Sequence, residues 1–255
     1  MFCVLNIEKR PDTLREKLFG SFIKDEYDAK MVSVFKAAPF YIFNVKIGKC
    51  GVDWDRIVYI AGKCARRLVL TNDTVLPKRN DISRFESNML YREMMGNTFK
   101  EIIKKLNTQK TVVIIDADGT SANFLYKIAP LASTLTVVTN AKEKYKRVCD
   151  NIQQNIGLCT VLQTTPVEAQ VKIDINRSVM TVTGEKSCVN ITDGCDFSVP
   201  EIYEKLLPDN TDKYTFYAAL YELCGVFSLG ECIFETITVN NEKISLCDLD
   251  TKAII

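Results

Sequence analysis

Six consecutive residues in the middle of the chain, Asp116-Ala117-Asp118-Gly119-Thr120-Ser121, carry the residue types most able to do chemistry. Two carboxylates, a glycine and two hydroxyls follow an apolar run and precede a helix-forming stretch. Amide groups at the start of a helix attract anions, so a phosphate is a natural ligand at such a place. Paired carboxylates can instead hold a divalent cation or share acid and base roles. This segment is therefore the first candidate site.

The rest of the composition excludes several other kinds of site. The 255 residues include no histidine, which removes Ser-His-Asp and Cys-His catalysis and every histidine-ligated metal. Lys and Arg number 33 against 32 Asp and Glu, and a net charge of +1 does not favour binding to nucleic acid or to an anionic membrane. The ten cysteines form no CxxC pair, which argues against a zinc ribbon or an iron–sulfur cluster.

Targeting and membrane signals are not found in the sequence. The first ten residues, MFCVLNIEKR, contain no long apolar run, and charges interrupt the most apolar windows elsewhere. Dispersed cysteines among apolar residues are typical of thiols in a reducing compartment. We therefore expect a cytoplasmic protein, and the sequence leaves open whether its partner is a small-molecule ligand or another protein.

The first part of the chain has the pattern of a mixed α+β domain. Short β-type runs occupy residues 2–7, 32–35, 41–47 and 67–71. Asp53 can cap a helix between the last two of these runs. An amphipathic, helix-type stretch then extends from Asp81 to about Asn107. We predict a first domain over residues 1–106.

The character of the chain changes at residue 111. Three apolar strands alternate with two helices, at 111–116, 121–131, 135–139, 141–156 and 159–164. This β-α-β-α-β order predicts a Rossmann-like three-layer α/β unit with a mainly parallel sheet. Strand-like runs continue over 171–192, two helices follow Pro200, and Asn240-Asn241 marks a terminal hairpin. We place this Rossmann-like domain at residues 107–255.

In this layout the segment 116–121 occupies the ligand-binding turn of a dinucleotide fold. It ends the first strand and precedes a helix, and the second strand ends at Thr139-Asn140, about 20 residues later. The two-part layout resembles that of shikimate dehydrogenase-like and glutamyl-tRNA reductase-like proteins, whose second part binds NADP. The resemblance implies that NADP or NAD would be held over Asp118, Gly119, Thr120, Ser121 and Asn140.

The residues at the fingerprint positions depart from that family. A GxGxxG alignment places Asp116, Asp118 and Ser121 where glycines let the backbone approach a pyrophosphate. Two carboxylates there would repel it, and Asn140 replaces the acidic residue that holds a ribose hydroxyl. The four basic residues within 142–147 could meet a 2′-phosphate or form a solvated helix face. We therefore predict a non-enzymatic or divergent ligand-binding or interaction protein.

A second family shares the same segment. DADGT at 116–120 matches the DxDGT motif of haloacid dehalogenase-like phosphatases, and Thr139 resembles that family's second motif. This resemblance implies that Asp116 is a nucleophile and that Asp118 is the acid/base. The ligands that it implies for Mg²⁺ are Asp116, Asp118 and either Asp193 or Asp196. The alternative function is thus a Mg²⁺-dependent phosphohydrolase.

A purely structural interpretation stays open for the same residues. Aspartate at a strand end, with glycine or serine at a helix start, is ordinary turn and capping chemistry, and Asp118 or Ser121 could do nothing more. Two basic pairs elsewhere, Arg66-Arg67 and Lys78-Arg79, could bind an anion in an interdomain cleft. The aromatic stretch from Tyr214 to Phe227, which includes Phe216, is expected to pack in the core or at a domain interface.

Overall fold

The computed structural model describes residues 1–10, 25–34, 39–47, 51–71, 74–106, 110–183, 187–192 and 194–249. Within these residues the chain is mixed α/β and divides into two compact units. The first unit comprises Met1–Leu90 with Pro200–Leu229, and the second comprises Tyr91–Val199 with Gly230–Ile255. This division differs from the expected one because the chain returns to the first unit at Pro200. The expected boundary itself falls at residues 107–109, which lie outside the described residues.

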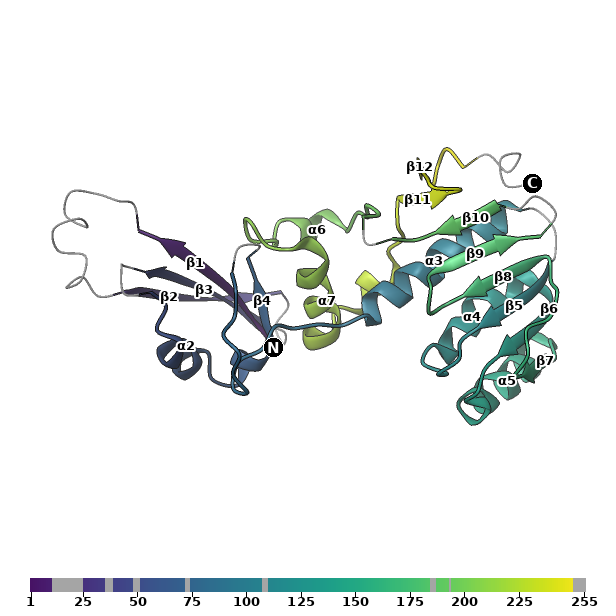
Figure 1. Cartoon of the computed structure of the whole chain (residues 1–255), viewed down its shortest axis with the longest axis horizontal. Helices are drawn as coiled ribbons and strands as arrows, with labels where there is room; N and C mark the ends of the chain where they lie inside the picture. The colour runs from purple at the N-terminus through teal and green to yellow at the C-terminus, as the bar shows by residue number, and fades with distance from the viewer. Residues whose placement is uncertain are drawn as a thin grey trace. The chain divides into compact units, whose positions relative to one another are not determined.

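The first unit is built on a sheet of four strands in the order β2-β3-β1-β4 (Figure 1). Their bounds are β1 Cys3–Lys9, β2 Glu26–Ser33, β3 Pro39–Ile47 and β4 Leu68–Leu70. Strand β1 pairs in parallel with both β3 and β4, whereas β2 pairs antiparallel with β3. The run expected at 32–35 is therefore only the end of a longer strand, and residue 35 lies outside the described residues.

Two helical elements follow β3 in the first unit. Helix α2 (Trp54–Ala61) begins at Asp53, whose side chain accepts a hydrogen bond from the Arg56 amide, so the predicted cap is confirmed. The 3-10 helix η1 (Gly62–Arg66) comes next, and its buried residues Cys64 and Ala65 anchor it to the unit. The chain then enters β4, which is completely buried.

The segment that returns to the first unit completes its core. It contains α6 (Glu201–Glu204), α7 (Lys213–Cys224) and the 3-10 helix η4 (Phe227–Glu231). On α7, the ring of Phe216 meets the rings of Phe2 and Phe40 edge-on, with centroids 6.0 and 5.4 Å away. All three rings are fully buried. Core packing of the aromatic stretch is thus confirmed at Phe216, whereas Phe227 at its end is 71% exposed.

The second unit is built on a sheet of eight strands in the order β12-β11-β10-β9-β8-β5-β6-β7. Their bounds are β5 Lys110–Ile115, β6 Ala132–Val138, β7 Thr160–Gln163, β8 Val171–Asp174, β9 Val179–Val182, β10 Ser187–Asn190, β11 Thr236–Val239 and β12 Glu242–Ser245. Three neighbouring pairs, β7-β6, β6-β5 and β5-β8, are parallel. The other four pairs, from β8 to β12, are antiparallel. The expected mainly parallel sheet is therefore wrong: the connections β8–β9, β9–β10 and β11–β12 are too short for a parallel crossover, and β11 returns antiparallel to β10 after the long segment 191–235.

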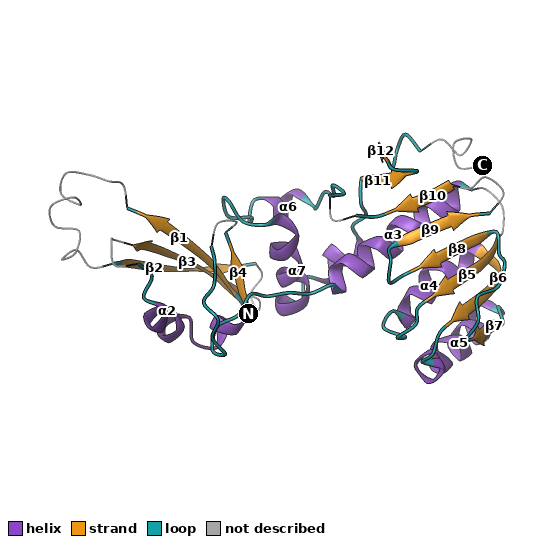
Figure 2. Ribbon diagram, in the orientation of Figure 1, coloured by secondary structure: helices purple, strands orange, loops and turns teal. Residues whose placement is uncertain are grey.

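The helices of the second unit form one layer on one face of this sheet (Figure 2). They are α3 (Met89–Lys105), the run η2 (Ala122–Phe124), α4 (Leu125–Ile128) and η3 (Ala129–Leu131), and α5 (Lys142–Ile156). Lys127 of α4 donates a hydrogen bond to Asn97 of α3, and α4 also packs against α5. The connection 164–170 between β7 and β8, which would have to cover the other face, contains no helix. The expectation of three layers is therefore wrong for the described residues.

Strand β5 still has the burial that its apolar sequence predicts. Val112, Val113 and Ile114 are each at most 2% exposed. Val113 points away from the helix layer and packs with Val138 and with Ala169 of the β7–β8 connection. A small apolar cluster thus covers the centre of the open face, and β5 is buried on both sides.

Two further local predictions have opposite outcomes. The helix expected from Asp81 begins only at Met89, because residues 83–85 pair with the edge of β4: the Leu68 amide donates to Ser83 and the Phe85 amide donates to Leu68. The terminal hairpin is confirmed, since β11 and β12 join at Asn240-Asn241 with φ of 49° and 73°, as a tight hairpin turn requires. Every helix in the described part of the chain falls short of the length and apolar character that crossing a bilayer needs.

Candidate functional site

The segment 116–121 lies at the carboxyl end of β5, where the sequence places it. The Asp116 amide donates to Val138 at the end of β6, and the Ile175 amide, just after β8, donates to Ile115. The Asn140 amide donates to Ala117 at 3.2 Å. Residues 116–121 and 139–140 therefore do come together at one edge of the parallel strands.

Asp116 has no solvent exposure at this edge. Its Oδ2 atom accepts a hydrogen bond from the Ser121 amide at 2.9 Å and another from the Tyr145 hydroxyl at 2.6 Å. Tyr145 lies on α5 and is also fully buried. Burial, together with the hydrogen bond to Asp116, raises the pKa of Tyr145, so its hydroxyl stays a proton donor. The carboxylate thus takes the place at the helix start that a bound anion would take.

The turn that follows Asp116 is packed against the start of α5. Gly119 has φ of +62°, and its amide donates to the Asp116 carbonyl at 3.3 Å. A Cβ atom on Gly119 would lie 2.9 Å from Ala141 Cβ and 3.0 Å from Lys144 Cδ. The Lys144 ammonium donates to the Asp118 carbonyl at 2.8 Å. The space beside Gly119, which would let a ligand approach the backbone, is therefore filled by Ala141 and Lys144 at the start of α5.

Two buried polar atoms of the loop have no hydrogen-bond partner among the described residues. They are Oδ1 of Asp116 and Oγ of Ser121. Such atoms are ordinarily satisfied by an ordered water molecule. Both are enclosed by protein, so a nucleotide could not contact either atom in this conformation. The side chain of Ser121 does not cap η2, which leaves Asp116 as the residue that orders the start of this helical run.

The same geometry bears on the phosphatase alternative. A nucleophilic Asp116 would have to reach phosphorus, but its carboxylate is buried and hydrogen-bonded, while Asp118 is exposed. Asp193 lies outside the described residues. Asp196 lies beside the start of β11, where the Glu235 amide donates to its carbonyl, so β10, β9 and β8 separate it from β5 in the sheet order, and its carboxylate accepts a hydrogen bond from Lys243. Where the chain is described, no group of three or more cysteines or carboxylates could hold a metal ion.

The basic residues within 142–147 form an exposed face of α5. Lys146 pairs with Glu143 at 2.8 Å, and Lys144 holds the Asp118 carbonyl as described above. Asn140 is exposed beside them, and the Thr139 hydroxyl accepts the Ala141 amide. These contacts agree with a solvated helix face.

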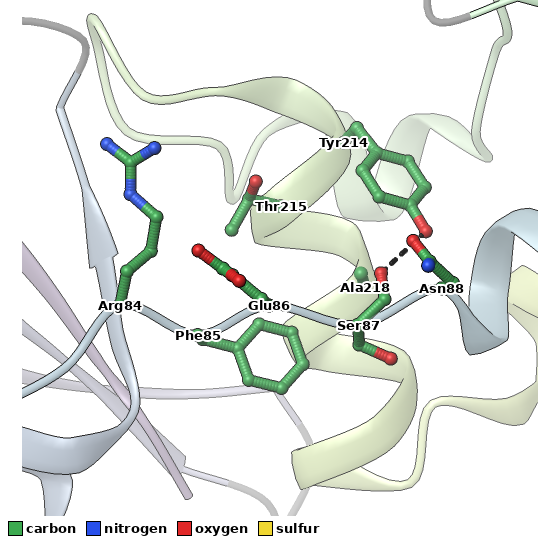
Figure 3. Close-up of a pocket in the computed structure, with 8 residues that line it drawn as sticks. All are labelled: Arg84, Phe85, Glu86, Ser87, Asn88, Tyr214, Thr215 and Ala218. Atoms are coloured by element: carbon green, nitrogen blue, oxygen red, sulfur yellow. Dashed lines mark hydrogen bonds between the residues drawn. The ribbon is translucent and has the colours of Figure 1, made fainter.

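A cavity of about 470 Å³ lies in the first unit, and of its lining residues only Tyr214 was singled out from the sequence, as a packing residue (Figure 3). Its lining consists of Arg84, Phe85, Glu86, Ser87, Asn88, Tyr214, Thr215 and Ala218. The side chains of Arg84 and Glu86 point into the same space as Thr215, whereas Phe85 points away (Figure 3). The Tyr214 hydroxyl donates to the Ser87 carbonyl at 3.0 Å. Opposite charges and hydroxyls therefore share one pocket of a size that small ligands occupy.

No polar/apolar alternation marks this cavity in the sequence, because residues 83–88 read Ser-Arg-Phe-Glu-Ser-Asn and contain one apolar residue, Phe85. The amphipathic stretch that starts at Asp81 instead predicted a helix through these residues. Arg84 and Glu86 were consequently expected on a helix surface and not in a pocket.

Comparison of the chain with protein-family models, with curated proteins and with solved structures gives no match. The resemblances to dinucleotide-binding proteins and to phosphatases therefore stay expectations. The function has to be argued from sequence and geometry.

Proposed function

We propose that the chain is a non-enzymatic ligand-binding or interaction protein, built on a Rossmann-like scaffold whose phosphate site is closed by its own carboxylate. The observation that carries the proposal is the Asp116 carboxylate, fully buried and bonded to the Ser121 amide and the Tyr145 hydroxyl. It satisfies from within the groups that would otherwise receive a phosphate.

The order of the parallel strands supports the scaffold. Counted from β5 along the chain, the neighbours β7-β6-β5-β8 read 3-2-1-4, the order that begins a Rossmann sheet. Ligands of such sheets bind at the carboxyl ends of the strands, beside the point where the order reverses. That point lies between β5 and β8, next to Asp116.

The electrostatics support the closure. A pyrophosphate brought to Ser121 would meet the Asp116 carboxylate in a buried position, where like charges repel strongly. It would also have to displace a hydrogen bond to a charged group, and such bonds contribute about 1.5–3 kcal/mol each. Gly119 offers no compensating space, because Ala141 and Lys144 already occupy it.

Thermal melting of the whole chain tests the proposal. The panel is NADP, NAD, S-adenosylmethionine, Mg²⁺, and Mg²⁺ with a phosphate-mimicking fluoride. A ligand at a hundredfold excess over its dissociation constant adds about 2.7 kcal/mol to the stability of the native state. We expect no shift of the melting midpoint with any of these ligands in the variant Arg66→Gln/Arg67→Gln, which removes an exposed arginine pair that could bind an anion away from the loop.

Two outcomes would overturn this function. A shift with a dinucleotide in the variant Arg66→Gln/Arg67→Gln would show that the loop opens and that the cofactor assignment holds. A shift with Mg²⁺ and fluoride in the wild type, lost in Asp116→Asn and kept in the exposed control Asp150→Asn on α5, would assign a nucleophilic Asp116. Hydrolysis of a phenyl phosphate that is equal in wild type and Asp116→Asn would exclude that nucleophile.

A further inference from the structure

A second cavity of the first unit, with a volume of about 540 Å³, lies beside η1. Its lining consists of Met1, Val58, Gly62, Lys63, Cys64, Arg66, Arg67 and Asp81. The pair Arg66-Arg67, which the sequence analysis considered for anion binding, thus lines a cavity within one unit.

Three cationic side chains of this cavity form no direct ion pair in the part of the chain that the structure describes. Lys63, Arg66 and Arg67 are all exposed, and none of them forms an ion pair or a side-chain hydrogen bond within the described residues. They lie within five consecutive positions, 63–67, which are the last four residues of η1 and the residue after it. Their positive fields therefore add in the same volume.

The single carboxylate of the lining belongs to Asp81, and it already has a cationic partner. Arg79 donates to it through two nitrogens, at 2.9 and 2.7 Å, and also pairs with Asp55 at 2.6 Å. This hydrogen bonding lowers the pKa of Asp81, so the carboxylate stays ionised and attached to Arg79. Counted together, the four cations Lys63, Arg66, Arg67 and Arg79 face two carboxylates, Asp55 and Asp81, and leave an excess of two positive charges.

The backbone that bears these cations is held in place by hydrogen bonds. The Ser83 hydroxyl donates to the Arg66 carbonyl at 2.9 Å, and the Ser83 amide donates to the Ala65 carbonyl at 2.9 Å. The Arg67 amide donates to Cys64, which is 4% exposed. The side chains therefore start from ordered positions, which reduces the entropy that a ligand would have to remove.

We propose that this cavity binds a small molecule with two or more negative charges, carried by phosphate or carboxylate groups. The planar fork of an arginine matches either group bidentately, and two adjacent arginines with a lysine suit a multivalent anion better than a single charge. Val58 and Met1 add an apolar wall for an uncharged part of the ligand. The volume lies within the range of small-molecule sites, about 300–1,000 Å³.

Isothermal titration of the full chain with inorganic pyrophosphate at low ionic strength tests this site. We expect one molecule bound per chain, with an affinity that falls at least tenfold in the double variant Arg66→Gln/Arg67→Gln. The matched control, Lys142→Gln/Arg147→Gln, removes the same charge from the exposed face of α5 and should bind as the wild type does. Citrate as a competitor separates the two sources of charge, because a carboxylate-specific site prefers citrate and a phosphate-specific site prefers pyrophosphate.

Three results would overturn the site. One is the lack of binding of either anion to the wild type at low salt. Another is an equal loss in both double variants, which would indicate an effect of net charge alone. The last is tight binding of a single-stranded oligonucleotide that pyrophosphate does not displace, which would indicate a nucleic-acid surface. None of these results depends on Asp116, so the site and the closed loop are tested separately.

Discussion

The loop at 116–121 and the cavity beside η1 use their charged groups in opposite ways. In the loop, the Asp116 carboxylate and the Ser121 amide satisfy one another, and Gly119 packs on α5. In the cavity, Arg66 and Arg67 extend into open volume while only their backbone is bonded to the protein. The loop contains the DxDGT pattern, whereas no motif in the sequence pointed to the cavity. The capacity to bind therefore depends on which polar groups the fold leaves without an internal partner.

Among the tests of this contrast between the loop and the cavity, substitution of Asp116 is expected to have the largest effect on stability. Asp116→Ala leaves the Ser121 amide and the Tyr145 hydroxyl buried without an acceptor, so we expect the free energy of unfolding to fall by about 3 kcal/mol or more. The control is Asp118→Ala, two residues along and exposed, which should stay within about 0.5 kcal/mol of the wild type. Urea unfolding measures both. Equal, small losses would mean that Asp116 is not a structural group of the loop.

The packing of Gly119 can be tested against Gly157, a second glycine with a similar positive φ. Gly157→Ala, at φ of +75° with open space around it, should cost about 1 kcal/mol of unfolding free energy from the backbone alone. Gly119→Ala adds a contact of 2.9 Å with Ala141, so we expect a further loss of about 1–3 kcal/mol. Melting midpoints of the two variants, compared in parallel, give the difference. A smaller loss at Gly119 would show that the loop can move away from α5.

Tyr145 gives the loop a dependence on alkaline pH. Its pKa is raised in the folded protein, mainly by burial, above the ordinary value of about 10. The unfolded chain therefore loses this proton first, so the contribution to stability is complete below about pH 10 and decreases above it. Tyr145→Phe should cost about 1–2 kcal/mol at pH 7 and flatten the loss of stability between pH 9 and about pH 11.

A tyrosine of the first unit provides the reference for this titration. Burial, and then Glu204, raises the pKa of Tyr217 to about 12. Because folding raises this pKa too, the contribution of Tyr217 to stability also decreases as the pH rises above about 10. A stability profile measured for Tyr145→Phe that matches the wild type at every pH would contradict the hydrogen bond to Asp116.

The smallest effect concerns the helix start beside the cavity of Figure 3. The Asp212 side chain accepts the Thr215 amide at 2.7 Å and so caps α7. Asp212→Ala should lower the unfolding free energy by about 1 kcal/mol. Asp53→Ala, which removes the corresponding cap of α2, should cost a similar amount. Thermal melting compares the two, and a loss for α7 far above that for α2 would show that Asp212 does more than cap the helix.

Sequence patterns correctly predicted those elements whose structure depends on residues close together in the chain. The apolar run 111–116 became β5, Asp53 became a cap, and Asn240-Asn241 became a hairpin turn. The failures involve partners far along the chain. The return of residues 200–229 to the first unit depends on Phe216 meeting Phe2, and the late start of α3 depends on β4 pairing with residues 83–85.

The candidate site shows the same limit. Its place at the end of β5 follows from the order of strands and helices. Whether Asp116 faces solvent or the protein depends on the hydroxyl of Tyr145, which lies 29 residues further along the chain, on helix α5. The DxDGT motif does not include Tyr145. It therefore predicted where the Asp116 carboxylate lies, but not that this carboxylate is buried and hydrogen-bonded.

The discontinuous first unit has a consequence for biosynthesis. Phe2 and Phe40 emerge from the ribosome early, but Phe216, the ring that meets both, is made after most of the second unit. The second unit likewise waits for β11 and β12 at the other end of the chain. Since domains otherwise tend to fold one after another during translation, the nascent chain must keep apolar surface exposed until residues 200–245 have been made. Folding factors that hold unfinished chains would therefore meet this protein during much of its translation.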